Sequence, residues 1–205
     1  MAFKFQYFQN ILKIMNPSLT FPSAAALAQH WQTQQNQAFA YPEVGSSAVD
    51  TPSGYDHDQE ATLLGFGDGV FRTAAQALRE WAMFPASWTQ IYPSNAPIET
   101  GSVVLVLFRL FGLWWWRNSS RIVYLIDEPA RFGFAYGTLP AHIERGEEIF
   151  WVELRDDGSV WYSIKAFSKP NRWYVWLAYP LARACQRKFR CDSFAAMERK
   201  VKSEK

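Results

Sequence analysis

The side chains best suited to acid–base or metal chemistry lie close together in one segment of the chain. His142 is followed by Glu144, Glu147 and Glu148, and imidazole and carboxylate groups serve as metal ligands and as proton shuttles. The chain has only three histidines, and its two cysteines lack metal-site spacing, so we predict no metal and no cofactor. His142, Glu147 and Glu148 are kept as a candidate polar site. The structural alternative is that Gly146-Glu147-Glu148 begins an edge strand and that one carboxylate pairs with a basic helix.

One other sequence feature resembles a ligand-binding motif only in part, and no nucleophile motif is found. Gly65-x-Gly67-x-Gly69 lacks the G-x-G-x-x-G spacing of dinucleotide sites, and a tight turn with Asp68 as a helix N-cap is the simpler interpretation. The chain has no G-x-S-x-G nucleophile motif. We therefore assign no catalytic residue. A weak hydrolase or isomerase using His142 and Glu148 is the alternative, and it requires the two side chains to meet within about 10 Å in one pocket.

Composition narrows the possible classes of protein. The chain has 205 residues, of which 49% are hydrophobic and 17% aromatic, which excludes a disordered or collagen-like protein and fits one domain with an appendage. The net charge of +2 gives no general reason to expect nucleic acid. Residues 165–205 carry a net charge of +8 and residues 1–164 a net charge of −6. The basic end is therefore expected to lie over an acidic body or to meet an anionic surface.

Targeting signals are not predicted. Met1–Met15 lacks an uninterrupted apolar stretch and a small-residue cleavage site, and the apolar run Val103–Trp116 is shorter than the roughly 20 residues of a membrane-spanning helix. Cys185 and Cys191 are too far apart in a helix to form a disulfide. We expect a cytoplasmic protein, with a location peripheral to a membrane as the alternative.

The chain divides into three predicted parts: an N-terminal helical arm over 1–40, a linker loop over 41–53 and an α+β domain over 54–201. Apolar spacing predicts one helix over Phe3–Met15, and Ser23 can cap a second helix that runs to about Phe39. The second helix carries a glutamine-rich face, which favours an exposed arm. The loop is rich in Pro, Gly and Ser, the usual composition of a boundary.

The α+β domain is predicted to begin with a strand and one helix, continue as an antiparallel meander and end in a long helix. The helix runs from Asp68 to about Met83, and Asp157-Gly158 favours a type I′ hairpin. A final helix spans Asn171–Val201, with a kink at Pro180. Its expected apolar stripe consists of Trp173, Leu177, Leu181, Cys185 and Phe189. The predicted strands are Glu60–Phe66, Ser87–Tyr92, Ser102–Phe111, Arg121–Ile126, Phe132–Leu139, Glu147–Arg155 and Val160–Phe167.

The strand Phe132–Leu139 alternates aromatic and small residues. Its aromatic rings share one face, and Gly133, Ala135 and Gly137 leave the other face open to close approach by a backbone, a helix or a ligand. We predict that a small apolar ligand contacts the aromatic face together with residues of the next two strands. The predicted ligand-binding residues are Phe132, Phe134, Tyr136, Trp151, Tyr162 and Ile164.

Two groups of residues are candidates for contact with a membrane or a protein partner. Trp114, Trp115 and Trp116 are consecutive, so a strand must place their rings on both of its faces. Arg183, Arg187 and Arg190 share one face of the last helix. Pairing of these arginines with the acidic body is the competing interpretation.

Several motifs resemble one family when they are taken together. They are Leu64-Gly65-x-Gly67, Glu128-Pro129, Phe132 to Pro140 (FGFAYGTLP), Gly146-Glu147-Glu148, Ala166-Phe167-Ser168-x-Pro170 and Gln186-Arg187. The chain is similar, over about residues 34–197, to the domain of unknown function 1990 family, also described as uncharacterised protein family 0548. This family has no agreed reaction. The predicted order of elements also resembles the helix-grip architecture of START-like proteins, in which a curved antiparallel sheet wraps a long C-terminal helix around an apolar cavity.

The fold prediction is therefore α+β: a curved antiparallel sheet of six or seven strands packed on a long C-terminal helix, with an N-terminal helical extension. The leading functional hypothesis is a binding module for a small apolar molecule or lipid. The alternative is a peripheral membrane or assembly protein that meets an anionic membrane surface or a protein partner. No nucleic-acid partner is expected.

Overall fold

The structure, a computed structural model, describes residues 18–50 and 52–203. The predicted helix over Phe3–Met15 lies outside the described residues. The elements, in chain order, are α2 (Ala24–Gln34), η1 (Ser46–Ala48), β1 (Asp56–Phe66), α3 (Asp68–Arg79), β2 (Thr89–Tyr92), β3 (Val103–Leu110), β4 (Trp114–Glu128), β5 (Arg131–Thr138), β6 (Glu144–Leu154), β7 (Ser159–Pro170), α4 (Trp173–Leu177) and α5 (Tyr179–Ser203).

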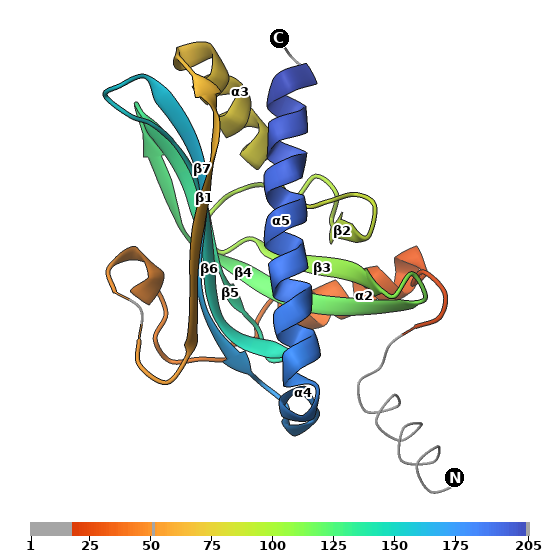
Figure 1. Ribbon diagram of the computed structural model, residues 1–205. Coiled ribbons are helices and arrows are strands. Elements are labelled where there is room, and N and C mark those ends of the chain that lie inside the picture. Colours follow the sequence, from red (N-terminus) through yellow and green to blue (C-terminus); the bar gives the residue numbers. More distant parts are fainter. Residues whose placement is uncertain (1–17, 51, 204–205) are drawn as a thin grey trace, which may run out of the picture.

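Seven strands form one antiparallel sheet in the order β1-β7-β6-β5-β4-β3-β2. The sheet is curved, and the long helix α5 lies across one of its faces with α3 beside it (Figure 1). We call this face the helix face and the opposite face the outer face. The predicted α+β fold, a curved antiparallel sheet on a long C-terminal helix, is confirmed. No helix in the described part of the chain combines the length and the apolar composition needed to cross a membrane.

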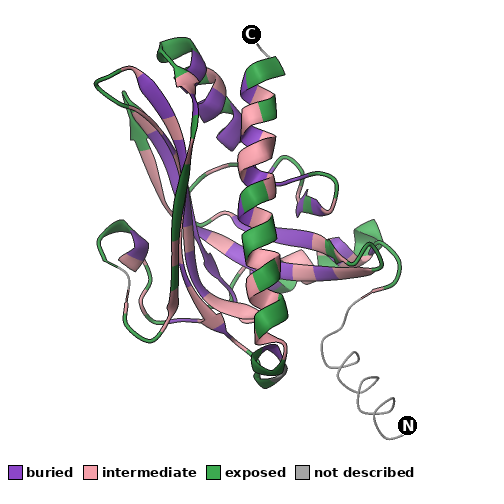
Figure 2. Ribbon diagram, viewed as in Figure 1, coloured by how far each residue is buried: buried purple, intermediate pink, exposed green. Residues whose placement is uncertain are grey.

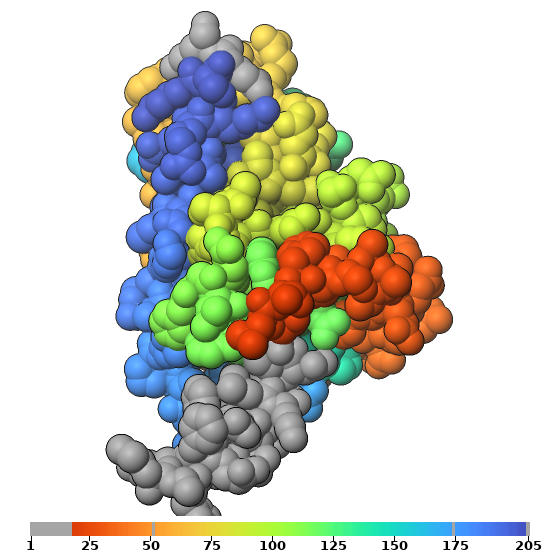
Figure 3. All heavy atoms as spheres, turned by 90° about the vertical axis from the view of Figure 1, so that its right-hand side faces the viewer, coloured from red at the N-terminus to blue at the C-terminus, as the bar shows by residue number. Residues whose placement is uncertain are grey.

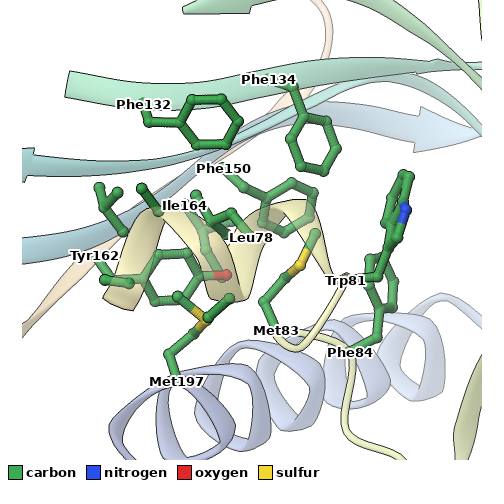
Figure 4. Close-up of a cluster of buried hydrophobic side chains, with 14 of the residues drawn as sticks. Leu78, Trp81, Met83, Phe84, Phe132, Phe134, Phe150, Tyr162, Ile164 and Met197 are labelled. Carbon is green, nitrogen blue, oxygen red and sulfur yellow. The ribbon is translucent and has the colours of Figure 1, made fainter. Parts of the chain in front are cut away.

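The main hydrophobic core lies between the helix face and the two helices. Phe134 and Phe150 of the sheet meet the side chains that follow α3, with ring centroids of Trp81 and Phe134 5.0 Å apart. Figure 4 shows these sheet residues pointing toward Leu78, Met83 and Phe84, with Met197 of α5 closing the cluster. This packing fixes α3 and α5 against one end of the sheet (Figure 2).

Strand alternation assigns the side chains of β6 to two environments. Glu148, Phe150 and Val152 lie on the helix face, whereas Glu147, Ile149 and Trp151 lie on the outer face. The same rule places the small residues of β5 on the outer face. An added Cβ at Gly133 would lie 2.3 Å from the carbonyl oxygen of Phe150. That contact comes from the neighbouring strand β6. On the outer face an added Cβ at Gly137 would meet the side chains of Tyr41 and Phe39, which is the close approach predicted behind the aromatic rings of β5.

The N-terminal segment covers part of the outer face. Ser23 caps α2 as predicted, its Oγ accepting from the Ala26 backbone N–H at 3.2 Å. Leu27 packs against Leu105 and Leu107 of β3, and the indole N–H of Trp31 donates to the carbonyl oxygen of Val103 at 2.8 Å. Figure 3 shows the red and orange atoms of this segment beside the green atoms of the β3–β4 hairpin. The segment therefore packs on the sheet, and the prediction of an exposed arm is wrong for α2.

The hairpin between β6 and β7 is confirmed, but its predicted turn type is wrong. A type I′ turn needs positive φ at both central residues, and only Gly158 has it, at +78°. The turn closes instead by a hydrogen bond from the Gly158 N–H to the Arg155 carbonyl oxygen at 2.8 Å. Asp157 Oδ1 accepts from the backbone N–H of Ser159 at 2.9 Å, which stabilises the three-residue loop. Leu154 therefore pairs with Val160, whereas a two-residue turn at Asp157-Gly158 would pair it with Trp161.

The final helical segment differs from its prediction. It is broken at Ala178 into α4 and α5, and Pro180 lies in the first turn of α5, where the absent N–H costs no hydrogen bond. Because α4 turns away from the core, Trp173 and Leu177 are exposed instead of buried.

Two smaller predictions are also wrong. Asp68 is the first residue of α3, and its N-cap is Gly67, whose φ is +88°. The strand that contains Gly146-Glu147-Glu148 is not at an edge, because β6 lies between β7 and β5.

Candidate functional site

A cavity of about 210 Å³ lies between the helix face of the sheet and the N-terminal half of α5. Its walls are mostly apolar and aromatic and come from β3, β4, α5 and the segment after α3. The main apolar lining residues are Phe84, Val106, Phe108, Trp116, Leu181 and Phe189. Polar groups from β1, β5, the loop between β5 and β6, β6 and α5 also line it, among them Asp58, Tyr136, His142, Glu144, Glu148, Gln186 and Arg190. The cavity thus combines an apolar wall with a carboxyl-rich polar group.

Tyr136 and Glu148 form the centre of this polar group. They are register partners on β5 and β6, so their side chains project side by side from the helix face. The Tyr136 hydroxyl donates to Oε2 of Glu148 at 2.8 Å. Among the described residues, this is the only hydrogen bond of the Glu148 carboxyl group.

Burial changes the acidity of Glu148. Desolvation raises the pKa of its carboxyl group to about 7, the hydrogen bond from Tyr136 opposes this rise, and the charge of Glu144 adds to it. Glu148 keeps part of its surface accessible because it lines the cavity. A carboxyl group with these properties can change protonation state near neutral pH and can exchange a proton or a hydrogen bond with a bound molecule.

Glu144 is the second carboxyl group of the site that forms no ion pair among the described residues. Gln186 of α5 donates from Nε2 to its Oε1 at 2.6 Å, and Ser168 Oγ accepts from the same nitrogen at 3.2 Å. Burial raises the pKa of Glu144 as well. The Gln186 amide therefore connects α5 to β6 and β7 beside the cavity.

His142 is buried and neutral. Its Nδ1 accepts the backbone N–H of Glu144 at 2.9 Å, so the ring proton is assigned to Nε2. Burial lowers the pKa of His142 to about 3. His142 and Glu148 line the same cavity, and acid–base chemistry by this pair stays a prediction.

The carboxyl group of Glu147, the other predicted polar residue, lies on the outer face of the sheet. Oε2 accepts from the Tyr41 hydroxyl at 2.7 Å and from the Gly45 N–H at 2.8 Å. Oε1 accepts from the Ser47 N–H at 3.1 Å and also from the Ser47 hydroxyl. Glu147 therefore fastens the segment 41–47 to the outer face of the sheet.

The arginines of α5 pair with acidic residues of β1. Arg183 donates both terminal nitrogens to Asp58, at 2.7 and 2.8 Å, and Arg190 reaches Asp58 at 3.2 Å and Glu60 at 2.8 Å. Burial would raise the pKa of Asp58, but the hydrogen bond from Arg183 and the charges of Arg190 and Arg183 lower it. The structure thus supports the interpretation that this basic stripe lies over an acidic body. Arg187 is exposed on the same helix.

The six predicted ligand-binding residues lie in three places. Tyr136 lines the cavity. Phe132, Phe134, Tyr162 and Ile164 belong to the main core, and α3 and α5 cover them (Figure 4). Trp151 lies on the outer face, its ring 5.6 Å from the Arg131 guanidinium. The face of β5 was therefore predicted correctly, but the cavity begins only at its Tyr136 end.

The three tryptophans alternate as the strand requires. Trp116 lines the cavity and stacks on Phe108, with centroids 6.2 Å apart. Trp115 points to the outer face, where its ring meets that of Phe21 at 5.0 Å. Trp114 is half-buried at the end of β4. Trp116 is therefore buried and is not available for the predicted contact with a membrane.

Sequence reasoning missed several lining residues, including Asp58, Phe84, Trp88, Phe108, Gln186 and Phe189. A usable signal existed for two of them: Phe189 belongs to the predicted apolar stripe of the last helix, and Gln186 lies next to Cys185 of that stripe. Phe84 and Trp88 line the cavity because of the path of the loop after α3, and the periodicity of apolar residues in the sequence does not predict that path. Within residues 18–50 and 52–203, no group of three or more His, Cys, Asp or Glu side chains is arranged to hold a metal ion.

The fold is that of a small α+β protein in which a mainly apolar cavity lies between a curved antiparallel sheet and a long C-terminal helix. The family model described as "Domain of unknown function (DUF1990)" matches residues 40–196, and the chain belongs to this family. A UPF0548 protein of Dictyostelium discoideum is 34% identical over 204 residues, covering 89% of this chain and 94% of the relative. A UPF0548 protein of Deinococcus radiodurans is 35% identical over 179 residues, covering 82% and 89%. The predicted family resemblance is therefore confirmed.

Solved structures with related shapes share little sequence with the chain. Human STARD10 has a TM-score of 0.47 and 9% identity, covering 88% of this chain and 81% of that chain. Ara h 8.0201 has a TM-score of 0.45 and 17% identity, covering 73% and 99%. Protein NE0264 from Nitrosomonas europaea has a TM-score of 0.49 and 9% identity, covering 75% and 98%. All three TM-scores are below 0.5, so nothing about the ligand of this chain follows from them.

Proposed function

We propose that the protein binds a small, mostly apolar molecule or lipid in the cavity between the sheet and α5. The observation that carries this proposal is the cavity itself, about 210 Å³ in volume and walled by aromatic rings. A dry engineered cavity of about 150 Å³ is large enough to bind benzene. Apolar walls with a few polar groups are the usual composition of small-molecule sites.

The proposal is tested with the neutral fluorophore N-phenyl-1-naphthylamine and a pair of variants in α5. Ala182 lines the cavity, whereas Ala184 is exposed two residues further along the same helix. Ala182→Phe fills the cavity and should lower the probe's affinity at least tenfold, and Ala184→Phe should leave it unchanged. The proposal fails if the wild-type protein does not bind the probe, or if both variants bind it as the wild type does.

A second candidate function, peripheral contact with a membrane, is favoured by the exposed apolar surface of α4. Trp173, Trp176 and Leu177 are 53%, 57% and 66% exposed. Val175 of the same helix and Leu181 at the start of α5 line the cavity. Tryptophan and leucine on a short exposed helix are suited to the membrane interface.

This second candidate is tested by flotation on vesicles of phosphatidylcholine with 30% phosphatidylglycerol. The wild type should float with the vesicles, and the double variant Trp176→Asp/Leu177→Asp should remain behind. Phe66→Asp is the control, because Phe66 is 64% exposed at the far end of β1. A wild-type protein that stays in the unbound fraction excludes the membrane candidate.

A further inference from the structure

We propose that the ligand carries an amino group and that this group binds the carboxylate of Glu148 inside the cavity. This inference rests on the proposed binding function and specifies the class of ligand: an amphiphile with a protonated amine and an apolar body.

The first argument is the balance of charge around the cavity. Asp58 and Glu60 of β1 form ion pairs with Arg183 and Arg190. Within the described residues, neither Glu144 nor Glu148 forms an ion pair, and their hydrogen-bond donors are the neutral side chains of Gln186 and Tyr136. Buried carboxylates are normally paired with a cation. Arg190 also lines the cavity, and the charges of Arg190 and Arg183 oppose the rise in the pKa of Glu148 and Glu144, respectively, but both guanidinium groups are engaged by Asp58. The cavity wall therefore has two carboxyl groups that form no ion pair among the described residues.

The second argument is the geometry of Glu148. Tyr136 occupies Oε2, and Oε1 has no hydrogen bond among the described residues although the side chain lines the cavity. An ammonium group has three N–H donors and no acceptor, which suits an acidic oxygen that lacks a donor. Glu144 lies four residues earlier on β6, roughly 13 Å away along the strand. One ammonium group therefore binds Glu148, and Glu144 adds negative charge to the same wall.

The third argument comes from Trp116, at another part of the cavity. Trp116 is 6% exposed and lines the cavity. Its indole N–H is buried and has no hydrogen-bond partner among the described residues. A buried donor left without an acceptor costs about 1–3 kcal/mol, and an acceptor atom on a ligand removes this cost. This observation is independent of the carboxyl groups. Because an ammonium group has no acceptor, satisfying this donor requires a second polar atom on the ligand and a turn of the Trp116 ring toward the cavity.

The remaining lining accounts for the apolar body of such a ligand. Phe84, Phe108 and Phe189 provide aromatic walls beside the polar groups. A cation held next to aromatic faces gains further attraction from them. A fatty acid with a similar apolar body is disfavoured, because the carboxyl groups of Glu144 and Glu148 would repel its carboxylate.

The test compares three probes of equal chain length: decylamine, decanol and decanoic acid. Each competes with N-phenyl-1-naphthylamine at pH 8. Because hydrogen bonds to charged groups are worth more than neutral ones, decylamine should bind roughly tenfold or more tightly than decanol, and decanoic acid should bind most weakly. Glu148→Gln should reduce the preference for the amine over the alcohol to less than about threefold, with decanol binding retained.

The matched control is Glu153→Gln, on the same strand but paired with Arg155 away from the cavity. This control should keep the preference of the wild type. If decanol binds and decylamine has no advantage, the amine inference is wrong while the proposed binding function stands. If none of the three probes binds, the proposed function itself fails.

Lowering the pH tests the contact between the amine and Glu148 in a second, independent way. Burial raises the pKa of Glu148 to about 7, so the carboxyl group is mainly protonated at pH 6 and mainly ionised at pH 8. The amine preference should therefore be smaller at pH 6, whereas an unchanged preference would contradict the assignment to Glu148. The titratable and charged groups that influence or share its environment are Tyr136, Tyr162, Glu144, Asp58, Arg190 and His142.

Discussion

Glu147 and Glu148 are neighbours on β6, yet their carboxyl groups lie on opposite faces of the sheet. Glu147 accepts hydrogen bonds from Tyr41, Gly45 and Ser47 on the outer face. Within the described residues, Glu148 accepts one hydrogen bond, from Tyr136, beside the cavity. One carboxylate is therefore fully used in holding the fold together, and the other retains an oxygen for a ligand.

The stability of the protein should depend on pH through Glu148. The pKa of this group is about 7 in the folded protein against 4.5 as its ordinary value. Between these values the folded state holds a proton that the unfolded state has released, so the stability is full below pH 4.5 and is lost as the pH rises through 7. At about 1.4 kcal/mol per unit, the loss is roughly 3 kcal/mol. Glu148→Gln should therefore gain stability relative to the wild type between pH 5 and pH 8 in urea denaturation. Parallel pH profiles for the two proteins would contradict this.

His142 should act in the opposite direction at lower pH. Burial holds its pKa at about 3, against 6.5 as its ordinary value. The unfolded state takes up a proton between these values and the folded state does not, so stability is lost as the pH falls below 6.5. His142→Gln keeps an acceptor for the Glu144 N–H and should lose roughly 2–3 kcal/mol less than the wild type between pH 7 and pH 4.5. Urea denaturation at both pH values measures this difference, and an equal loss in the two proteins would show that His142 is not a buried neutral group.

Replacing Glu147 should release the segment that crosses the outer face. Glu147→Gln removes the negative charge and replaces one of the two accepting oxygens by an amide group. We expect the free energy of unfolding to fall by roughly 2–3 kcal/mol. Hydrogen exchange at the Gly45 and Ser47 amides should become faster while the amides of β6 and β7 remain protected. The half-exposed Glu153 on the same strand supplies the control, because Glu153→Gln should change stability by less than about 0.5 kcal/mol. Unchanged exchange at Gly45 and Ser47 would mean that other contacts hold this segment.

Gly133 should not tolerate a side chain. A Cβ there would lie 2.3 Å from the Phe150 carbonyl oxygen and 2.5 Å from the Trp151 Cβ, and these groups belong to a paired strand that cannot move aside. Gly133→Ala should cost about 3 kcal/mol or more. Gly69 in α3 has nothing within 4 Å of an added Cβ, so Gly69→Ala should be neutral or slightly stabilising. Thermal unfolding of the two variants measures the contrast, and similar midpoints would refute it.

The sequence was most informative where local periodicity determines structure. The alternation of Phe132, Phe134 and Tyr136 gave the correct face of β5, because a pleated strand leaves no other choice. It did not reveal that α3 covers Phe132 and Phe134 and leaves Tyr136 beside a cavity. That difference depends on contacts across the fold, such as the packing of Trp81 on Phe134. The polar site was predicted only in part for the same reason. The alternation of side chains along a strand places Glu147 and Glu148 on opposite faces, but only the register between β5 and β6 places Tyr136 beside Glu148.

The end of the chain shows the other limit of sequence reasoning. A helical stripe from Trp173 to Phe189 assumes one continuous helix. The break at Ala178 rotates the first part, so Trp173 and Leu177 are exposed while Leu181, Cys185 and Phe189 line the cavity. Pro180 indicated an interruption, but its position in the first turn of α5 follows from the packing of both helices.

The most direct test of ligand binding is the anomalous diffraction of crystals soaked with 1-iododecane. The cavity between the sheet and α5 should contain an iodine peak among the side chains of Phe84, Phe108 and Phe189, and crystals of the Ala182→Phe variant should lack it. A wild-type crystal with no peak in this cavity, or with iodine only on the molecular surface, would contradict the proposal that this protein binds an apolar molecule there.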